Sequence, residues 1–356
     1  LNLKPVGTGP FELSQVVKKG DQIESVELES NKKYYFGSPF IESIKLIFFE
    51  NQQDALSAFN GGKINGLALS SILDLERINP SLSFDKYSFP LPRYFGLFFN
   101  EQKNKALSEK SVRQALAHAI DKKAIIKQVL KGQASVIDSA IPPFLFGYNQ
   151  NIDVYDFVPE HAKNLLISAG WQDSNGDGVA EKQDQALELT ISLPEWPELI
   201  QIATLIKKYW EDIGVRVTLD IREPKIVQKD IIKTREYQIL LFGEALGIEP
   251  DPFAFWHSSQ KNDPGLNLSL YQNKKADALL EEARQDINPE SQAEKLNQLQ
   301  TIIAQDLPAI FLYSPDFLYA VDKKVKSISE QLINMPAERF NNIEQWYIRT
   351  KRSWRK

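Results

Sequence analysis

Apolar and polar positions along the chain alternate with a strand period or recur with a helix period, most regularly in the central third. Residues 187–193 alternate as a strand, and residues 215–221 form a second strand after Gly214. Between these strands, apolar side chains recur at helical spacing: Leu199, Ile202, Leu205, Ile206, Tyr209 and Trp210. This order of strand, helix and strand predicts a parallel pair joined by a right-handed crossover.

The same periodicity and the residues that begin and end helices predict further elements on both sides of this unit. Asn51 and Asp121 can cap helices, and Gly61-Gly62 and Gly132 can end them. The predicted helices are 52–59, 111–120, 122–130, 159–170, 225–235, 277–285 and 290–305. The predicted strands outside the central unit are 45–49, 237–242 and 309–313. Together these elements indicate the α/β class with mixed sheets.

Composition and charge narrow the class of protein. A chain of 356 residues favours two domains or lobes. The net charge of −5 argues against a protein that binds duplex nucleic acid, and the absence of cysteine excludes disulfides and thiolate chemistry. The chain starts at Leu1 without a signal-peptide pattern, so we expect a processed piece. The basic tail, residues 349–356, is predicted to be a solvated terminus.

Sequence motifs of common enzymes are missing from the chain. It contains no G-x-S-x-G, H-E-x-x-H or P-loop pattern, and Gly7-Thr8-Gly9 is predicted to form a tight turn. Of the three histidines, His118 and His161 lie in helical patterns and are expected to be packing or surface residues. His257 follows Trp256 in an aromatic loop, where a role in a site is more plausible. A hydrolase with an unrecognised site is kept only as an alternative.

One segment has the pattern of a calcium loop. The sequence DSNGDGV places oxygen donors Asp173, Asn175 and Asp177 at alternate positions, followed by Glu181 and Asp184 at positions nine and twelve. A strand is predicted after this segment, whereas a helix follows a typical calcium loop. An Asx-rich turn is therefore the alternative. Calcium-dependent adhesion would rest on this loop alone, and we otherwise expect no cofactor.

Aromatic and acidic residues follow two of the predicted parallel strands. Trp196 lies just past one strand, and residues 243–256 lie past another. Ligands of open α/β sheets bind at the carboxyl ends of strands, where aromatic side chains can form pocket walls. The predicted stacking residues are Trp196, Phe242 and Trp256, and the predicted polar anchors are Glu244 and Asp251. The alternative is that these aromatic residues belong to the core, as we expect for Phe253.

Several blocks, in order along nearly the whole chain, resemble the extracellular solute-binding proteins of ABC importers, in the dipeptide, oligopeptide and nickel-binding family. The most recognisable is the helix VRQALAHAID, residues 112–121. The other blocks are Pro5–Phe11, Asn31–Asn65, Ala162–Trp171 with Asn175–Gly178, Pro250–Pro252 and Asp306–Pro308.

The resemblance implies a two-lobed, periplasmic-binding-protein-like clamshell of type II. Residues 1–100 and 316–356 would then belong to the first lobe, and residues 101–315 would form the second. Members of the family begin well before the first block. We therefore expect that the first strand of lobe one and its inserted domain are missing from this sequence.

The resemblance also implies binding rather than catalysis. A peptide-like solute would enter between the lobes, and the closed form would deliver it to the transmembrane subunits of an ABC permease. The protein would be a monomer in the periplasm, or lipid-anchored on the outer face of the membrane, with no nucleic-acid partner.

The sequence departs from the peptide-binding pattern at one place. Peptide-binding relatives carry an Asp shortly before the Pro-Asp pair, whereas Ala245–Glu249 contains none; Glu244 or Glu249 can substitute electrostatically. A differently anchored peptide, an oligosaccharide and a metal chelate therefore remain open as solutes. A sensing receptor for a nutrient or pheromone, with the same fold, is a further alternative.

Overall fold

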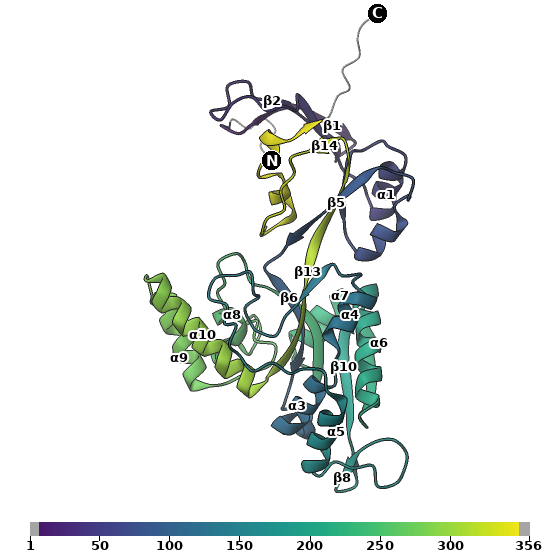
Figure 1. Cartoon of the computed structure of the whole chain (residues 1–356), viewed down its shortest axis with the longest axis vertical. Helices are drawn as coiled ribbons and strands as arrows, with labels where there is room; N and C mark the ends of the chain where they lie inside the picture. The colour runs from purple at the N-terminus through teal and green to yellow at the C-terminus, as the bar shows by residue number, and fades with distance from the viewer. Residues whose placement is uncertain (1–6, 349–356) are drawn as a thin grey trace, which may run out of the picture. The chain divides into compact units, whose positions relative to one another are not determined.

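The computed structural model describes residues 7–348, which divide into two compact units (Figure 1). Within this range, unit 1 comprises residues 7–90 and 316–348, and unit 2 comprises Leu91–Pro315. The chain thus leaves unit 1 once and returns to it once. The lobe boundaries expected from the resemblance stay a prediction. Pro5, Val6 and the basic tail lie outside the described residues.

Unit 2 is built on a mixed sheet with the strand order β11-β10-β12-β6-β13, and β7 pairs with β13. β10 pairs in parallel with β11 and β12, whereas β6 runs antiparallel to both β12 and β13. The predicted parallel pair is therefore confirmed, as is the α/β class. The strands are β6 (Arg93–Phe99), β7 (Ala134–Val136), β10 (Glu188–Pro194), β11 (Arg216–Arg222), β12 (Ile239–Ala245) and the first half of β13 (Ala309–Asp322).

The helices of unit 2 lie beside this sheet, and α9 and α10 pack against each other (Figure 1). A small hairpin of β8 (Glu181–Lys182) and β9 (Gln185–Ala186) follows α5. The helices of unit 2 are α2 (Lys105–Ser108), α3 (Lys110–His118), α4 (Lys122–Gln128), α5 (Pro159–Ser168), α6 (Pro197–Glu211), α7 (Pro224–Ile226), η2 (Val227–Ile232), α8 (Phe253–Trp256), η3 (Ser258–Gln260), α9 (Lys274–Gln285) and α10 (Pro289–Asp306).

The helix α6 connects the parallel strands β10 and β11 as its sequence predicts. Pro197 occupies the first turn, where its missing N–H leaves no intrahelical bond unmade. The apolar stripe is buried, and Trp210 at its end is fully buried, with its indole N–H donating to the Leu116 carbonyl at 3.0 Å. Gly214 then adopts a positive φ of 90° and lets the chain turn into β11.

The predicted helix over 225–235 is only partly correct. The segment forms the short helix α7 and then the π-helical turn η2, with Val227 and Ile231 buried. It ends at Arg235, whose φ is 58° and whose guanidinium donates to the carbonyl oxygens of Lys261 and Gly265. These tertiary hydrogen bonds end the helix at a residue type that by itself favours helix.

Unit 1 contains elements that the periodicity missed. Its strands are β1 (Phe11–Lys19), β2 (Gln22–Ser30), β3 (Ser43–Ile47), β4 (Gly66–Leu69), β5 (Phe84–Pro90), β14 (Val325–Lys326) and β15 (Tyr347–Ile348). β1, β2 and β3 form an antiparallel sheet, and β4 and β5 pair with the second half of β13. Its helices are α1 (Gln52–Asn60), η1 (Ile72–Arg77), η4 (Pro336–Phe340) and η5 (Ile343–Gln345). Among these elements, only α1 and a strand close to β3 were predicted.

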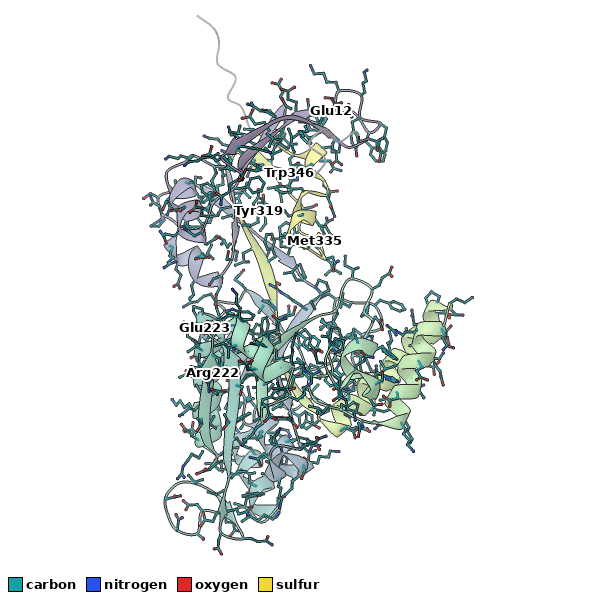
Figure 2. All side chains as sticks on the ribbon, turned by 180° about the vertical axis from the view of Figure 1, so that it is seen from behind. Glu12, Arg222, Glu223, Tyr319, Met335 and Trp346 are labelled. Atoms are coloured by element: carbon teal, nitrogen blue, oxygen red, sulfur yellow. The ribbon has the colours of Figure 1, made fainter. Side chains whose placement is uncertain are left out.

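An aromatic cluster packs where β13 passes through unit 1. Tyr319 contacts Phe340 and Trp346, with ring centroids 6.2 and 6.4 Å apart, and Figure 2 labels Tyr319 and Trp346 in this cluster. The guanidinium of Arg339 lies 4.0 Å from the ring centroid of Phe340. A Cβ at Gly66 would lie 2.2 Å from the Tyr319 hydroxyl oxygen, so the close approach of the ring requires glycine there.

None of the helices in residues 7–348 combines the length and the apolar character that a membrane crossing requires.

Removing the Trp210 side chain tests whether burial holds α6 on unit 2. We expect Trp210→Ala to lower the free energy of unfolding by about 3–5 kcal/mol, because it leaves a large cavity and an unpaired Leu116 carbonyl. Denaturant unfolding of the full chain measures this loss. The control is Lys207→Ala on the exposed side of α6, expected to change stability by about 0.5 kcal/mol or less. Equal losses of unfolding free energy in both variants would contradict the role of buried Trp210 in holding α6.

Candidate functional site

The carboxyl ends of β10, β11 and β12 lie at one edge of the unit 2 sheet, because the three strands are parallel. Pro194 pairs with Arg222 in the register of this edge, and Figure 2 shows Arg222 and Glu223 at the end of β11. Trp196 follows β10 and stacks on Phe242 of β12, with ring centroids 6.0 Å apart and planes inclined by 25°. Trp196 keeps 38% of its surface exposed. The structure thus brings these two predicted stacking residues together at a solvent-accessible edge.

A second aromatic pair, which the sequence analysis missed, belongs to the same edge. β6 is antiparallel to β12, so its first residues pair with the last residues of β12: Phe95 lies opposite Gly243. Phe95 stacks on Tyr313 of β13, with centroids 5.2 Å apart and planes inclined by 11°. A Cβ at Gly243 would lie 2.9 Å from the Phe95 ring, so glycine leaves room for this stack. The apolar run around Phe95 is a sequence signal for a buried strand, but it does not indicate that Phe95 reaches this edge.

A half-buried cation, Arg93, begins β6 at this edge, opposite Ala245. Its Nε is buried and has no hydrogen-bond partner in residues 7–348. Burial lowers the pKa of the guanidinium, while the nearby Tyr313 opposes that effect. Glu198, in the first turn of α6, raises the pKa of Tyr313 together with burial, which is the larger cause. Aromatic surface and one desolvated positive charge therefore occur together here.

Two of the predicted ligand residues lie in the interior of unit 2. Glu244 is 4% exposed and accepts a hydrogen bond from the Tyr94 hydroxyl. Trp256 is 1% exposed and packs against Phe311 and Tyr271. Burial raises the pKa of Glu244 well above the usual carboxyl range, and the Tyr94 hydrogen bond only partly offsets this. These positions give both side chains a role in packing, and direct contact with a solute stays a prediction.

Asp251, the other predicted anchor, lies at the surface in an ion pair. Its carboxylate accepts from the Arg284 guanidinium, with the shortest N–O distance 2.5 Å. Arg284 also lies 4.0 Å from the ring centroid of Phe253, and that ring stacks on His257 with centroids 4.1 Å apart. Phe253 is half-buried. The Asp251 carboxylate is thus engaged within unit 2, and its role in binding is untested.

His257, the histidine that the sequence singled out, lies between α8 and η3. Its Nδ1 accepts from the backbone N–H of Ser259 at 3.1 Å and lies 2.8 Å from the Ser259 hydroxyl. Its Nε2 lies 3.2 Å from a carboxylate oxygen of Glu281. These contacts cap the turn after α8, which accounts for the burial of the ring. His118 and His161 pack against each other, with ring centroids 4.7 Å apart, as expected for packing residues.

The segment with the calcium-loop pattern forms a turn closed by its own hydrogen bonds. One oxygen from each of Asp173, Asp177 and Glu181 lies within 4.8 Å of the others. Both Asp173 oxygens accept loop N–H groups, and the Asn175 side chain accepts the N–H of Asp177. Arg216 also pairs with Asp177 at 3.2 Å. Internal donors therefore occupy these oxygens, and calcium binding stays an untested prediction.

A polar cavity of about 370 Å³ lies at the opposite end of the unit 2 sheet. Glu101, which follows β6, and Arg113 of α3 contribute to its wall and form an ion pair at 3.3 Å. The Arg113 guanidinium also donates to the carbonyl oxygens of Leu107, Asp306 and Leu307. These bonds fix the turn between α10 and β13. The charged groups of this cavity thus hold the fold together.

Comparison with known proteins identifies similar sequences over almost the whole chain. A sequence profile of bacterial extracellular solute-binding proteins, family 5 Middle, matches residues 1–267. The oligopeptide-binding protein AppA of Bacillus subtilis is 28% identical over 97% of this chain and 62% of its own length. A dipeptide-binding protein of Escherichia coli is 27% identical over 92% of this chain and 59% of its own length. The chain therefore spans about three-fifths of these curated relatives.

Solved structures agree with the sequence matches. The structure of Bacillus subtilis AppA in complex with a nonapeptide superposes with a TM-score of 0.70 at 27% identity, covering 98% of this chain and 68% of that one. NikZ of Campylobacter jejuni in complex with Ni(L-His) superposes with a TM-score of 0.74 at 26% identity, covering 97% and 69%. The two-lobed binding fold expected from the sequence is thereby confirmed.

The buried position of Glu244 predicts a specific pH dependence of stability. The unfolded chain ionises this carboxyl in its ordinary range, while burial keeps the folded carboxyl neutral at higher pH. Wild-type stability should therefore fall as pH rises above about 4.5, and Glu244→Gln should lack this contribution. We measure the free energy of unfolding of both proteins by thermal melts between pH 4 and 8. From pH 4 to pH 8, the free energy of unfolding of Glu244→Gln minus that of the wild type should increase by more than about 1 kcal/mol.

The control for this experiment is Glu195→Gln, which changes an exposed carboxyl near the same edge. Its melting curves should follow those of the wild type across the pH range. Parallel pH profiles for Glu244→Gln and wild type would mean that Glu244 is ionised in the folded protein.

Proposed function

Because the chain belongs to the bacterial extracellular solute-binding proteins, family 5, we propose that it is part of the substrate-binding component of an ABC importer. It captures a peptide-like solute outside the cytoplasm and presents the solute to the transmembrane subunits of the permease. The solute leaves unchanged, so the protein is a binder and not an enzyme. The relatives named for peptides, with identities near 28%, support this assignment.

The observation that carries the proposal is the aromatic edge of the unit 2 sheet. The partly exposed Trp196, stacked on Phe242, and the half-buried Phe95, stacked on the buried Tyr313, present apolar ring surface where parallel strands end. Such surface binds extended chains and planar groups with little dependence on their sequence. This edge fits the broad range of side chains that a peptide importer has to accept.

The proposed location and assembly follow from the same assignment. The protein works in the periplasm, or on the outer face of the cell membrane when a lipid anchors it, and it acts as a monomer. The closed form binds the solute more tightly than the open form does, so the solute shifts the protein toward the closed form that the permease recognises.

A metal chelate is the second candidate solute, since the similar NikZ structure contains Ni(L-His). Mass spectrometry of the purified full-length protein, first under native and then under denaturing conditions, distinguishes the candidates. A ladder of released peptides supports peptide transport. A single metal chelate or sugar would contradict it.

Truncation of the exposed stacking residue tests the proposed binding edge. We expect Trp196→Ala to weaken binding of a random peptide pool by about tenfold or more, because it removes a ring stack and its apolar contact area. The free energy of unfolding should change little, since the Trp196 side chain is partly exposed. Titration calorimetry and thermal melts measure the two effects.

Trp256→Ala is the matched comparison for this test. Its side chain is buried, so the variant should lose about 3–5 kcal/mol of stability. Unchanged peptide affinity in Trp196→Ala would contradict the placement of the solute at this edge.

A further inference from the structure

Arg93 differs from the other arginines at and near the aromatic edge. Arg222, at the end of β11, pairs with the Asp220 carboxylate at 2.5 Å. Arg284, on α9, pairs with Asp251. Within unit 2, no ion pair joins Arg93 to a carboxylate, and its buried Nε has no hydrogen-bond partner. Arg93 is therefore a cation without an ion-pair partner in unit 2, on the same sheet face as the stack of Phe95 on Tyr313.

The buried arginines elsewhere in unit 2 show that the fold normally satisfies such groups. The guanidinium of Arg113 donates to three backbone carbonyl oxygens at 2.7 to 3.0 Å. That of Arg235 donates to three others. Arg339 of unit 1 also has an Nε without a partner, but its guanidinium lies over the Phe340 ring and donates to the Pro336 carbonyl. Arg93 has neither kind of compensation within unit 2.

The surroundings of Arg93 limit what can compensate it. Burial lowers the pKa of its guanidinium, which reflects the cost of taking the charge out of water. Its neighbour across the strand pair, Ala245, offers only a methyl group. Glu198 is close enough to raise the pKa of Tyr313, although burial is the larger cause. An anion supplied from outside would offset part of the free energy that desolvation costs.

We propose that Arg93 binds a carboxylate of the transported solute and so makes the site selective for acids over their amides. This assignment rests on the proposed function. A guanidinium presents parallel N–H donors that match the two oxygens of a carboxylate, and such charge-assisted pairs are stronger in a desolvated site. The half-buried ring of Phe95, held by its stack on the buried Tyr313, then contacts the apolar part of the solute next to that carboxylate.

The test compares two pools of random peptides, three to nine residues long and without Asp or Glu. One pool has free C-terminal carboxyl groups, and the other has C-terminal amides. The full-length wild type should bind the free-acid pool at least about tenfold more tightly than the amide pool, because only the acid pairs with the guanidinium. Titration calorimetry gives both affinities, and thermal melts give the stability without solute.

Three variants complete the design. Arg93→Gln should lose the preference for acids, and Arg93→Lys should keep part of it, because it retains the charge without the paired donors. Arg222→Gln removes a cation of the same edge that is already paired, so the preference should persist. Melting temperatures without solute check that each variant is folded, and the lysine variant still decides the question if the glutamine variant is not.

The outcomes separate this assignment from the proposed function. Equal affinity of the wild type for acids and amides, with Arg93→Gln unchanged, overturns the role of Arg93 and leaves peptide binding in place. A preference that also disappears in Arg222→Gln overturns the assignment to Arg93, because it indicates a general electrostatic effect. Failure of the wild type to bind either pool overturns peptide binding itself, and the carboxylate assignment with it.

Discussion

The pairing of β6 with β12 on one side and with β13 on the other is the constraint on which the candidate site depends. This register sets Arg93 opposite Ala245, Tyr94 opposite Glu244 and Phe95 opposite Gly243. Because neighbouring strand positions point to opposite faces, a shift by one residue would turn each of these side chains to the other face. The aromatic stack, the buried hydroxyl–carboxyl pair and the position of Arg93 thus follow from a single ladder of backbone hydrogen bonds.

Two acidic residues close together in sequence have opposite electrostatic situations in this structure. Glu244 is buried, and burial favours its neutral form, so it acts as a polar part of the core beside Tyr94. Asp251 stays exposed and is held by Arg284. A carboxylate that anchors a ligand needs to be charged and accessible. Glu244 is not accessible, and the exposed Asp251 is already paired with Arg284. Arg93, by contrast, is half-buried and has no ion-pair partner in unit 2.

The similarity to proteins that bind peptides and to one that holds Ni(L-His) shows how one scaffold serves different solutes. Backbone geometry is shared at 26–27% identity, with TM-scores of 0.70 and 0.74. Strand pairing and core burial tolerate extensive substitution when volume and pattern are kept. The shared fold therefore leaves the choice of solute to the side chains of the site.

The sequence by itself determined the local elements and the family. Helix caps, glycine stops and the periodicity of residues 187–221 are short-range signals, and they correctly predicted α6 between two parallel strands. Ordered blocks of sequence identified the solute-binding family. Tertiary structure alone decided which residues reach the site, since β6 is inserted from a distant part of the chain and brings Arg93 to the end of β12. Burial of Trp256 and Glu244 likewise depends on neighbours far away in sequence, which no local pattern encodes.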